Sequence, residues 1–207
     1  MVTLKVDKLA KSYASEPVFK GLSFQFRGGV IGIAGPNGSG KSTLMRCVTG
    51  LTRPTSGTVT WSVNGDEYST GTIPSMLGYS APYVNLYEEL TTSENLAFIR
   101  DLRSSQECEA IPELVQRFDL TEFADSPFGD LSSGQQQRVK LAVAAVHRPA
   151  ILCLDEPGTN LDEPGHRIVE QMIRSCAENS GLVLLASNQP RELDLCDHIL
   201  PVAGAKK

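Results

Sequence analysis

The stretch GPNGSGKST at positions 35–43 fits the pattern G-x-x-x-x-G-K-[ST], in which a glycine-rich turn wraps its backbone N–H groups around nucleotide phosphates. The apolar residues 30–33 before it predict a short buried strand, and residues 41–48 after it predict a helix that stops near Gly50. A helix start offers unpaired N–H groups and the positive end of a dipole to an anion. We therefore expect a phosphate site formed by Gly35, Pro36, Asn37, Gly38, Ser39, Gly40, Lys41, Ser42 and Thr43.

Two side chains of this loop have specific expected roles. Lys41 should reach the β- and γ-phosphates of a nucleotide, and the Ser42 hydroxyl should bind Mg²⁺. An ordinary glycine-rich turn between a strand and a helix is the plain alternative. Because all four fixed positions of the pattern and its strand–helix context are present, the sequence favours a nucleotide-binding site.

The composition is that of an ordinary globular protein. A chain of 207 residues, 41% hydrophobic and 21% charged, is long enough for one domain with a hydrophobic core. A net charge of −5 argues against broad electrostatic binding to nucleic acid or anionic lipid. The five cysteines lack C-x-x-C spacing, which indicates reduced thiols in a cytoplasm rather than a disulfide framework. No apolar run approaches the length of a membrane span, so a membrane role would need a partner.

Apolar periodicity predicts an α/β fold interrupted by helices. Residues 2–7 and 22–27 alternate as half-exposed antiparallel strands do, with a polar loop at 11–15 between them. From 92 to about 147 the spacing favours helices, the last of them capped by a hydroxyl in residues 131–133 and running to His147. Further strands are expected at 58–63, 76–80, 151–154 and 182–185, with a hairpin turn at 64–66 and a crossover helix at about 165–176.

Two adjacent carboxylates follow the apolar run at 151–154. Asp155 and Glu156 would lie just past the C-terminal end of a parallel strand, which is the edge of an open sheet where ligands bind. Asp155 is placed to hold Mg²⁺, and Glu156 is placed to take a proton from an attacking water. Adjacent carboxylates could instead be a solvated strand end, but a phosphate loop in the same sheet favours the site.

Two further stretches carry a resemblance to one family. Over essentially its full length, the chain resembles the nucleotide-binding subunit of ATP-binding cassette (ABC) transporters. Residues 131–135, LSSGQ, resemble that family's signature motif, with Ser133 where a second glycine is usual. Residues 158–162, GTNLD, resemble its D-loop, with Asp162 at the acid position that faces the dimer partner. Tyr13 stands where the family places an aromatic residue that stacks on adenine.

The resemblance implies an α/β P-loop ATPase fold with a mostly parallel sheet, an N-terminal antiparallel β subdomain and an inserted α-helical subdomain. In one domain of 207 residues, the core and β subdomain would span about 1–84 and 148–207, and the helical subdomain about 85–147. It also implies a head-to-tail dimer, of like or unlike subunits, that sandwiches two ATP molecules with Mg²⁺. In that dimer, residues of one copy would close over the ATP held by Lys41 of the other: Ser132, Ser133, Gly134 and Gln135.

The resemblance further implies a place on the cytoplasmic face of a membrane, held there by an integral membrane subunit whose transport the ATPase energises. We expect that subunit to dock near residues 82–90, where Tyr83, Leu86 and Tyr87 could accept a helix or could instead pack the subdomain's own core. The layout is closest to the haem exporter ATPase of cytochrome c maturation. A multidrug or lipoprotein exporter fits nearly as well, so the substrate stays open.

Two switch positions depart from the family pattern. Pro82 stands where a glutamine usually touches Mg²⁺ and the attacking water, and proline has no side-chain amide. Asn188 stands where a histidine usually contacts the γ-phosphate, and its amide cannot become a cation. Because Lys41, Asp155 and Glu156 remain, we expect hydrolysis, but slower than in relatives that hold both switch residues.

Three other interpretations stay open. A nucleotide-gated regulatory module with negligible turnover is suggested by Pro82 and Asn188. An ABC protein outside transport, in repair or translation, would usually carry two cassettes or long insertions, and this sequence shows neither. A small-molecule kinase would leave residues 131–135 and Asp162 without a role.

Overall fold

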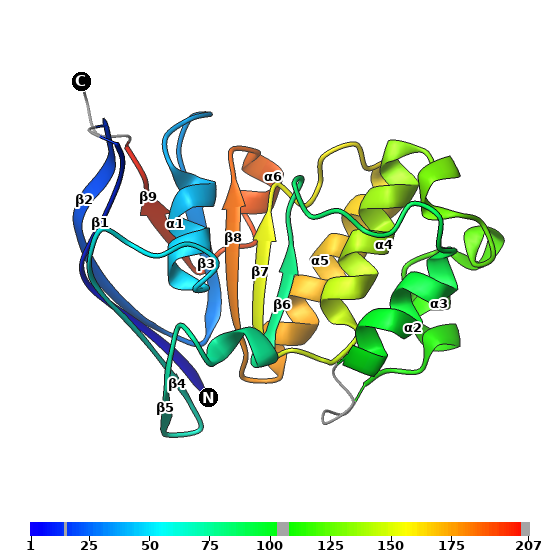
Figure 1. Ribbon diagram of the computed structural model, residues 1–207, viewed down its shortest axis with the longest axis horizontal. Helices are drawn as coiled ribbons and strands as arrows, with labels where there is room; N and C mark the ends of the chain where they lie inside the picture. The colour runs from blue at the N-terminus through cyan, green and yellow to red at the C-terminus, as the bar shows by residue number, and fades with distance from the viewer. Residues whose placement is uncertain (15, 103–107, 204–207) are drawn as a thin grey trace.

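A computed structural model describes residues 1–14, 16–102 and 108–203, except for the side chains of Pro74 and Ser75, and shows two sheets with helices between and beside them (Figure 1). The antiparallel sheet has the strand order β2-β1-β4-β5. Its strands are β1 (Val2–Tyr13), β2 (Glu16–Arg27), β4 (Ser56–Val63) and β5 (Asp66–Ser69). The predicted hairpin turn between β4 and β5 is confirmed, because Asn64 and Gly65 have the positive φ angles, 54° and 99°, that such a turn requires.

The second sheet is parallel and has the order β6-β7-β8-β3-β9. Its strands are β6 (Leu77–Ser80), β7 (Ile151–Asp155), β8 (Leu182–Ser187), β3 (Gly29–Ala34) and β9 (His198–Pro201). Strands β7 and β8 are buried along their whole length, as their uninterrupted apolar runs predicted. The mixed architecture confirms the α/β fold with a parallel and an antiparallel sheet.

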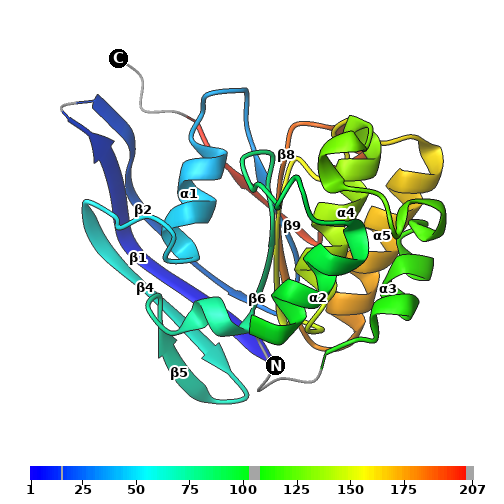
Figure 2. The ribbon, with the colours of Figure 1, turned by 45° about the vertical axis from the view of Figure 1, so that its right-hand side comes forward.

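The parallel sheet separates two cores. On one face, α1 (Lys41–Val48) packs with the antiparallel sheet, and Met45, Trp61 and Cys153 belong to the same buried cluster. On the other face, α4 (Ser133–Ala145) and α5 (Glu163–Glu178) cover the sheet. Figures 1 and 2 show α2 (Thr92–Leu102) and α3 (Ile111–Arg117) outside α4, on the side away from the antiparallel sheet.

The remaining helices are short. They are the 3₁₀ turns η1 (Ile73–Met76), η2 (Thr121–Phe123) and η3 (Phe128–Asp130), and α6 (Pro190–Leu193) after β8. No helix in the described ranges has the length and apolar character that crossing a membrane requires.

Two sequence expectations about element ends were wrong. The polar loop expected at 11–15 is mostly strand, since β1 continues to Tyr13; its last residue, Ser15, lies outside the described residues. The alternation of β1 breaks near Lys8, whose φ is 48° where the register with β2 shifts, and this irregularity hid the rest of the strand. The helix expected to reach His147 ends at Ala145.

Candidate nucleotide-binding site

The phosphate loop joins β3 to α1 and lines a cavity of about 380 Å³. Gly38 and Gly40 have φ angles of 79° and 100°, which side-chain-bearing residues rarely adopt. A Cβ atom on Gly40 would lie 2.6 Å from Cγ1 of Val18, so the loop also needs glycine for close packing. The cavity is lined by Val18, Asn37, Gly38, Gly40, Lys41, Ser42, Thr43 and Glu156.

Lys41 is the cation at the centre of this cavity. Its side chain is only 6% exposed, and its Nζ donates a hydrogen bond of 2.8 Å to the Gly35 carbonyl oxygen. The same Nζ lies 3.5 Å from Oε1 of Glu156. The first helical residue after the loop therefore presents a positive charge where a bound phosphate would meet the helix N-terminus.

Asp155 is a buried carboxylate without a hydrogen-bond partner. It is 1% exposed, and neither of its oxygens is hydrogen-bonded within the described part of the chain. Burial raises the pKa of Asp155, while the nearby Ser42 hydroxyl and the charges of Lys41 and Arg46 act to lower it. Unsatisfied carboxylate oxygens beside a hydroxyl are the hard ligands that Mg²⁺ prefers, so the residues present fit this cation.

Glu156 follows Asp155 in a strained conformation. Its φ is 49°, which is uncommon for a residue with a side chain, and its backbone N–H donates to the Ala186 carbonyl oxygen at 2.8 Å. The turn directs the partly exposed side chain toward Lys41 instead of continuing the strand pattern. Two neighbouring carboxylates are thereby separated: one is buried beside Ser42, and the other borders the cavity.

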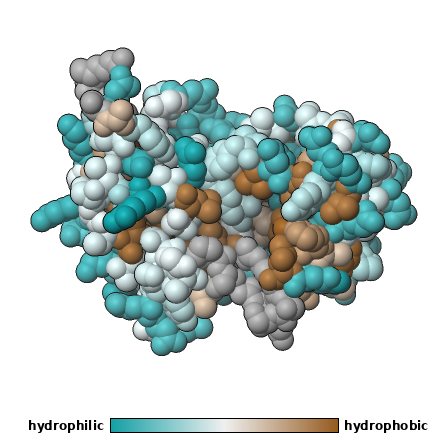
Figure 3. Space-filling view, viewed as in Figure 1, coloured by the Kyte–Doolittle hydropathy of each residue, from teal (hydrophilic) through white to brown (hydrophobic). Residues whose placement is uncertain are grey.

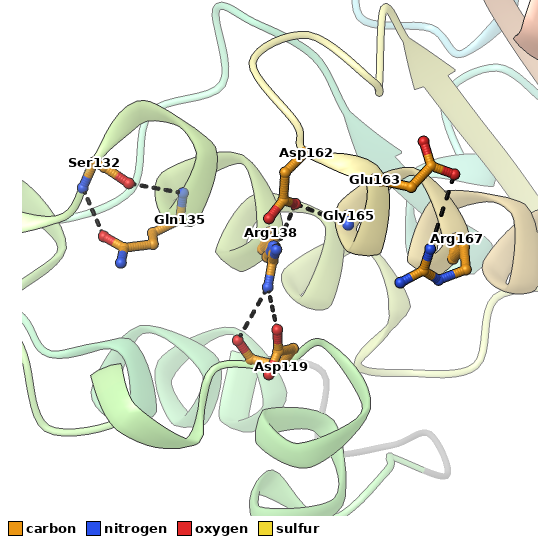
Figure 4. A network of polar contacts seen from close by, with 8 residues as sticks. All are labelled: Asp119, Ser132, Gln135, Arg138, Asp162, Glu163, Gly165 and Arg167. Carbon is orange, nitrogen blue, oxygen red and sulfur yellow. Dashed lines mark hydrogen bonds and ion pairs between the residues drawn. The ribbon is translucent and has the colours of Figure 1, made fainter.

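The signature residues begin α4 with a capping box (Figure 4). The Ser132 hydroxyl oxygen accepts a hydrogen bond from the Gln135 backbone N–H at 3.4 Å, and Oε1 of Gln135 accepts one from the Ser132 backbone N–H at 2.8 Å. A Cβ atom on Gly134 would lie 2.8 Å from the Asn160 carbonyl oxygen, so this position needs glycine. Because α4 and α1 cover opposite faces of the sheet, the two motifs do not converge within one chain.

The D-loop at 158–162 is bound to the signature helix of the same chain. Oδ1 of Asp162 accepts hydrogen bonds from Arg138 at 2.6 Å and from the Gly165 backbone N–H at 3.0 Å, which caps α5 (Figure 4). The hydrogen bond from Arg138 is the main reason why the pKa of Asp162 is lowered. Nε2 of Gln137 donates to the Pro157 carbonyl oxygen at 2.8 Å. Asp162 thus has structural partners in its own subunit.

The switch positions and the aromatic position lie at the margins of the site. Nδ2 of Asn188 donates to Oδ1 of Asn37 at 3.0 Å, which places this exposed asparagine on the phosphate loop. Pro82 is exposed, and its carbonyl oxygen accepts a hydrogen bond of 3.2 Å from Lys140. Tyr13 ends β1 and is 47% exposed.

The family profile described as "ABC transporter" matches residues 19–159 of this sequence. The chain belongs to the ABC transporter family. It is an ATP-binding domain of the ABC ATPase type.

An "Uncharacterized ABC transporter ATP-binding protein YdbJ" of Bacillus subtilis (strain 168) is 36% identical over 95% of this chain and 65% of its own length. The "Nod factor export ATP-binding protein I" of Rhizobium meliloti (strain 1021) is 36% identical over 100% of this chain and 63% of its own length. The chain therefore spans less than two thirds of these relatives.

Solved structures agree with the ABC ATPase fold. The "Structure of ATP binding subunit of ABC transporter" superposes with a TM-score of 0.85, at 26% identity, over 97% of this chain and 85% of that one. The "Dimeric structure of a post-hydrolysis state of the ATP-binding cassette MJ0796 bound to ADP and Pi" also gives a TM-score of 0.85, at 22% identity, over 97% of this chain and 94% of that chain. At that identity the second likeness shows the fold alone.

The ABC ATPase site brings together some of the predicted residues and adds others. Lys41, Ser42 and Glu156 line one cavity, whereas Ser132 and Gln135 begin a helix on the opposite face of the sheet. Residues for which the sequence predicted no role at the nucleotide site also lie in or around it: Val18, Arg46, Tyr79, Tyr83, Gln137 and Glu192. For Gln137, the only signal in the sequence was its position shortly after the LSSGQ stretch. The contacts of the other residues depend on strand register and loop packing.

Proposed function

We propose that the chain binds Mg-ATP, pairs with a second ATPase subunit, hydrolyses the nucleotide and energises transport through a separate membrane-spanning subunit. The observation that carries this proposal is Asp155, a buried and unpartnered carboxylate at the end of a parallel strand, beside the Ser42 hydroxyl and the Lys41 cation. A buried carboxylate is costly, and the nearby Ser42, Lys41 and Arg46 offset this cost only in part, since burial remains the main influence on the Asp155 pKa. A cation held by Asp155 and Ser42 would supply that compensation and neutralise phosphate charge.

The residues of the cavity would have different roles in hydrolysis. Lys41 now donates to Gly35 and lies beside Glu156, so it must exchange these contacts for the β- and γ-phosphates when nucleotide binds. That exchange would release Glu156, which then serves as the base that takes a proton from the attacking water. Asn188 can offer the γ-phosphate a neutral hydrogen bond from the edge of the loop.

Pairing of two subunits follows from where the motifs lie. The signature begins α4, on the opposite face of the sheet from α1, and its helix N-terminus is a second anion site. A second copy, or an unlike subunit, would present Ser132, Ser133, Gly134 and Gln135 to the ATP held by Lys41. Tyr13 would stack on the adenine, and Asp162 would face the partner's D-loop.

A membrane subunit would dock on the α2 side of the molecule. Exposed aromatic side chains occur there, with Tyr83 44%, Tyr87 54% and Phe98 38% exposed, while Leu86 packs against the core. The ring of Tyr87 meets that of Phe98 edge-on at 5.1 Å, and Figure 3 shows hydrophobic surface over this side. This arrangement supports docking of a membrane subunit, and with it a peripheral position on the cytoplasmic face of a membrane.

The same proposal covers domain organisation and substrate class. The chain would be one ATPase domain, with a core and β subdomain at about 1–84 and 148–207 and a helical subdomain at about 85–147. Relatives named for Nod factor export and, in Escherichia coli (strain K12), a "Probable multidrug ABC transporter ATP-binding protein YbhF" support export. Multidrug export, and haem export as the layout of the sequence suggested, are the candidate processes.

Sedimentation of the Glu156→Gln variant tests the central claim. Without its base, the protein should trap Mg-ATP and sediment as a dimer, whereas Glu156→Gln combined with Lys41→Ala should stay monomeric because the phosphate contact is lost. A strictly monomeric Glu156→Gln protein at saturating Mg-ATP would refute self-pairing, and failure to bind ATP at all would refute the function. Phosphate release that is measurable in the wild type and lost in Glu156→Gln distinguishes an enzyme from a regulatory module with negligible turnover.

A further inference from the structure

A pair of tyrosines lies beside the proposed Mg²⁺ site, and the function described above gives it no role toward the nucleotide. Tyr79 is on β6, and Tyr83 is in the loop that follows it. The two hydroxyl groups contact each other, and the ring centroids are 6.3 Å apart. Tyr83 is 44% exposed, so one side of the pair faces open space rather than the core.

Strand register places this pair next to Asp155. In the parallel pairing of β6 with β7, Tyr79 lies opposite Cys153. Asp155 is two residues farther along β7, so its side chain leaves the sheet on the same face as those of Cys153 and Tyr79. Burial is the main reason why the pKa values of Tyr79 and Tyr83 are raised, and the charge of Asp155 raises both further, which supports the proximity. Both hydroxyls therefore keep their protons at neutral pH and remain hydrogen-bond donors.

Arg46 connects Tyr83 to the phosphate loop. Its guanidinium carbon lies 5.2 Å from the centre of the Tyr83 ring, within cation–π range. Nε of the same side chain donates to the Ser42 carbonyl oxygen at 3.3 Å, and Nη2 contacts Oγ1 of Thr43 at 3.5 Å. Tyr83 is thus coupled to the helix turn that carries the predicted phosphate and Mg²⁺ ligands.

The neighbouring Pro82 cannot make an equivalent contact. It has no polar side chain, and its carbonyl oxygen already accepts a hydrogen bond of 3.2 Å from Lys140 on α4. The loop is therefore held at residue 82 by the signature helix, while its next residue, Tyr83, carries a hydroxyl that contacts the hydroxyl of Tyr79.

We propose that Tyr83, supported by Tyr79 and Arg46, is the positioning residue that donates a hydrogen bond to the hydration shell of Mg-ATP and thereby compensates for the missing glutamine at position 82. This inference rests on the proposed function, since it requires Mg-ATP at Asp155 and Ser42. The proposed hydrogen bond would connect the loop after β6 directly to the bound nucleotide. Through this loop, α2 and the proposed docking surface can respond to the cation.

Binding of Mn²⁺ to the ATP-loaded protein, followed by electron paramagnetic resonance, tests the proposal without relying on turnover. In a Glu156→Gln background, Tyr83→Phe should weaken Mn²⁺ binding about tenfold, the effect expected for one hydrogen bond to an ion-bound group. Phenylalanine keeps the ring over Arg46, so the fold and metal-free ATP binding should not change. Tyr68→Phe, on β5 of the antiparallel sheet, is the matched control and should have no effect.

A rescue variant makes the test specific for the hydroxyl's role. Adding Pro82→Gln to Tyr83→Phe should restore Mn²⁺ affinity to within about twofold of the parent, because a side-chain amide would again reach the cation's edge. A Tyr83→Phe protein that binds Mn²⁺ as tightly as its parent would overturn the proposal while leaving the proposed function intact. A parent that binds ATP but no Mn²⁺ would overturn both.

Discussion

Asp155 and Glu156 are adjacent carboxylates, but their side chains lie in different environments. Asp155 is 1% exposed and lacks a hydrogen-bond partner in the described structure, whereas Glu156 is partly exposed and lies 3.5 Å from the Lys41 ammonium. The positive φ of Glu156, 49°, separates the two side chains. A buried charge that its neighbours compensate only in part lowers the stability of the nucleotide-free protein, so Asp155 favours ligand binding at the expense of stability.

Asp155→Asn should therefore stabilise the nucleotide-free protein. Removing a buried charge that its neighbours compensate only in part should gain about 1–2 kcal/mol and raise the melting temperature by about 2–8 °C at pH 7. The same variant should lose most of the further rise that Mg-ATP gives the wild type, because the carboxylate ligand is absent. Thermal melts with and without Mg-ATP measure both effects. Asp66→Asn, at the exposed start of β5, is the control; an unchanged or lower melting temperature for Asp155→Asn would contradict the argument.

Asn188→His should speed hydrolysis. Asn188 already contacts Asn37 of the phosphate loop, so a histidine here is within reach of a bound γ-phosphate and can add a charge-assisted contact. We expect phosphate release to rise about tenfold, less than the roughly 10²–10³ of a whole electrostatic contact, because the asparagine can already offer a neutral hydrogen bond. Asn188→Ala should not show this gain. No increase in rate, alone or together with Pro82→Gln, would count against a slow wild-type enzyme.

Some helix and strand boundaries could be predicted from sequence patterns, and others could not. The bounds of α1 and the buried strands β7 and β8 were predicted closely, because a phosphate-loop pattern and uninterrupted apolar runs are strong local signals. The second half of β1 was missed because a register shift near Lys8 breaks its alternation. The predicted division at about 85 and 147 stays a prediction, since nothing in the fold alone shows that the helices move or fold as a unit.

The cap of α4 can be tested at the level of this element. Ser132→Ala removes the hydroxyl that accepts from the Gln135 backbone N–H and should cost about 1 kcal/mol of unfolding free energy. The neighbouring Ser133→Ala is the control, because that exposed side chain begins the helix but does not cap it. Urea denaturation without nucleotide measures both variants. Equal losses for the two serines would show that the capping box is not what stabilises the start of the signature helix.

At the scale of the whole molecule, the residues that sequence reasoning missed are those placed by contacts between distant elements. Lys41, Ser42, Asp155 and Glu156 could be predicted because each belongs to a local pattern at a strand or helix end. Tyr83 was expected only on the docking surface, because its contacts with Tyr79 and Arg46 depend on how the loop after β6 packs. Arg46 meets Tyr83 only once α1 and the loop after β6 pack on the same face of the sheet.

Buried Glu192 is another long-range contact, and it makes stability depend on pH. Glu192 is 2% exposed, and its Oε1 accepts from the Gly158 backbone N–H at 2.8 Å, joining α6 to the D-loop. Burial raises its pKa most; the charge of Glu156 raises it further, while Ser187, Gly158 and His166 lower it. The folded state therefore holds the proton to higher pH than the unfolded chain. The stability contributed by protonated Glu192 is complete below the unfolded pKa of about 4.3 and is lost as pH rises toward the folded value.

Glu192→Gln should remove this pH dependence, since glutamine keeps an oxygen for Gly158 but cannot ionise. As pH rises from about 4.5 to 7, the melting temperature of the variant should increase relative to that of the wild type. Glu163→Gln is the control of opposite sign, because hydrogen bonds of 2.6 and 2.7 Å from Arg191 lower the pKa of the exposed Glu163. That variant should be less stable than the wild type by a nearly constant amount over this interval, because the ion pair is already formed above the unfolded pKa of about 4.3, and the difference should shrink only as pH falls below that value. Parallel curves for wild type and Glu192→Gln would mean that Glu192 ionises in the folded protein as readily as in the unfolded chain.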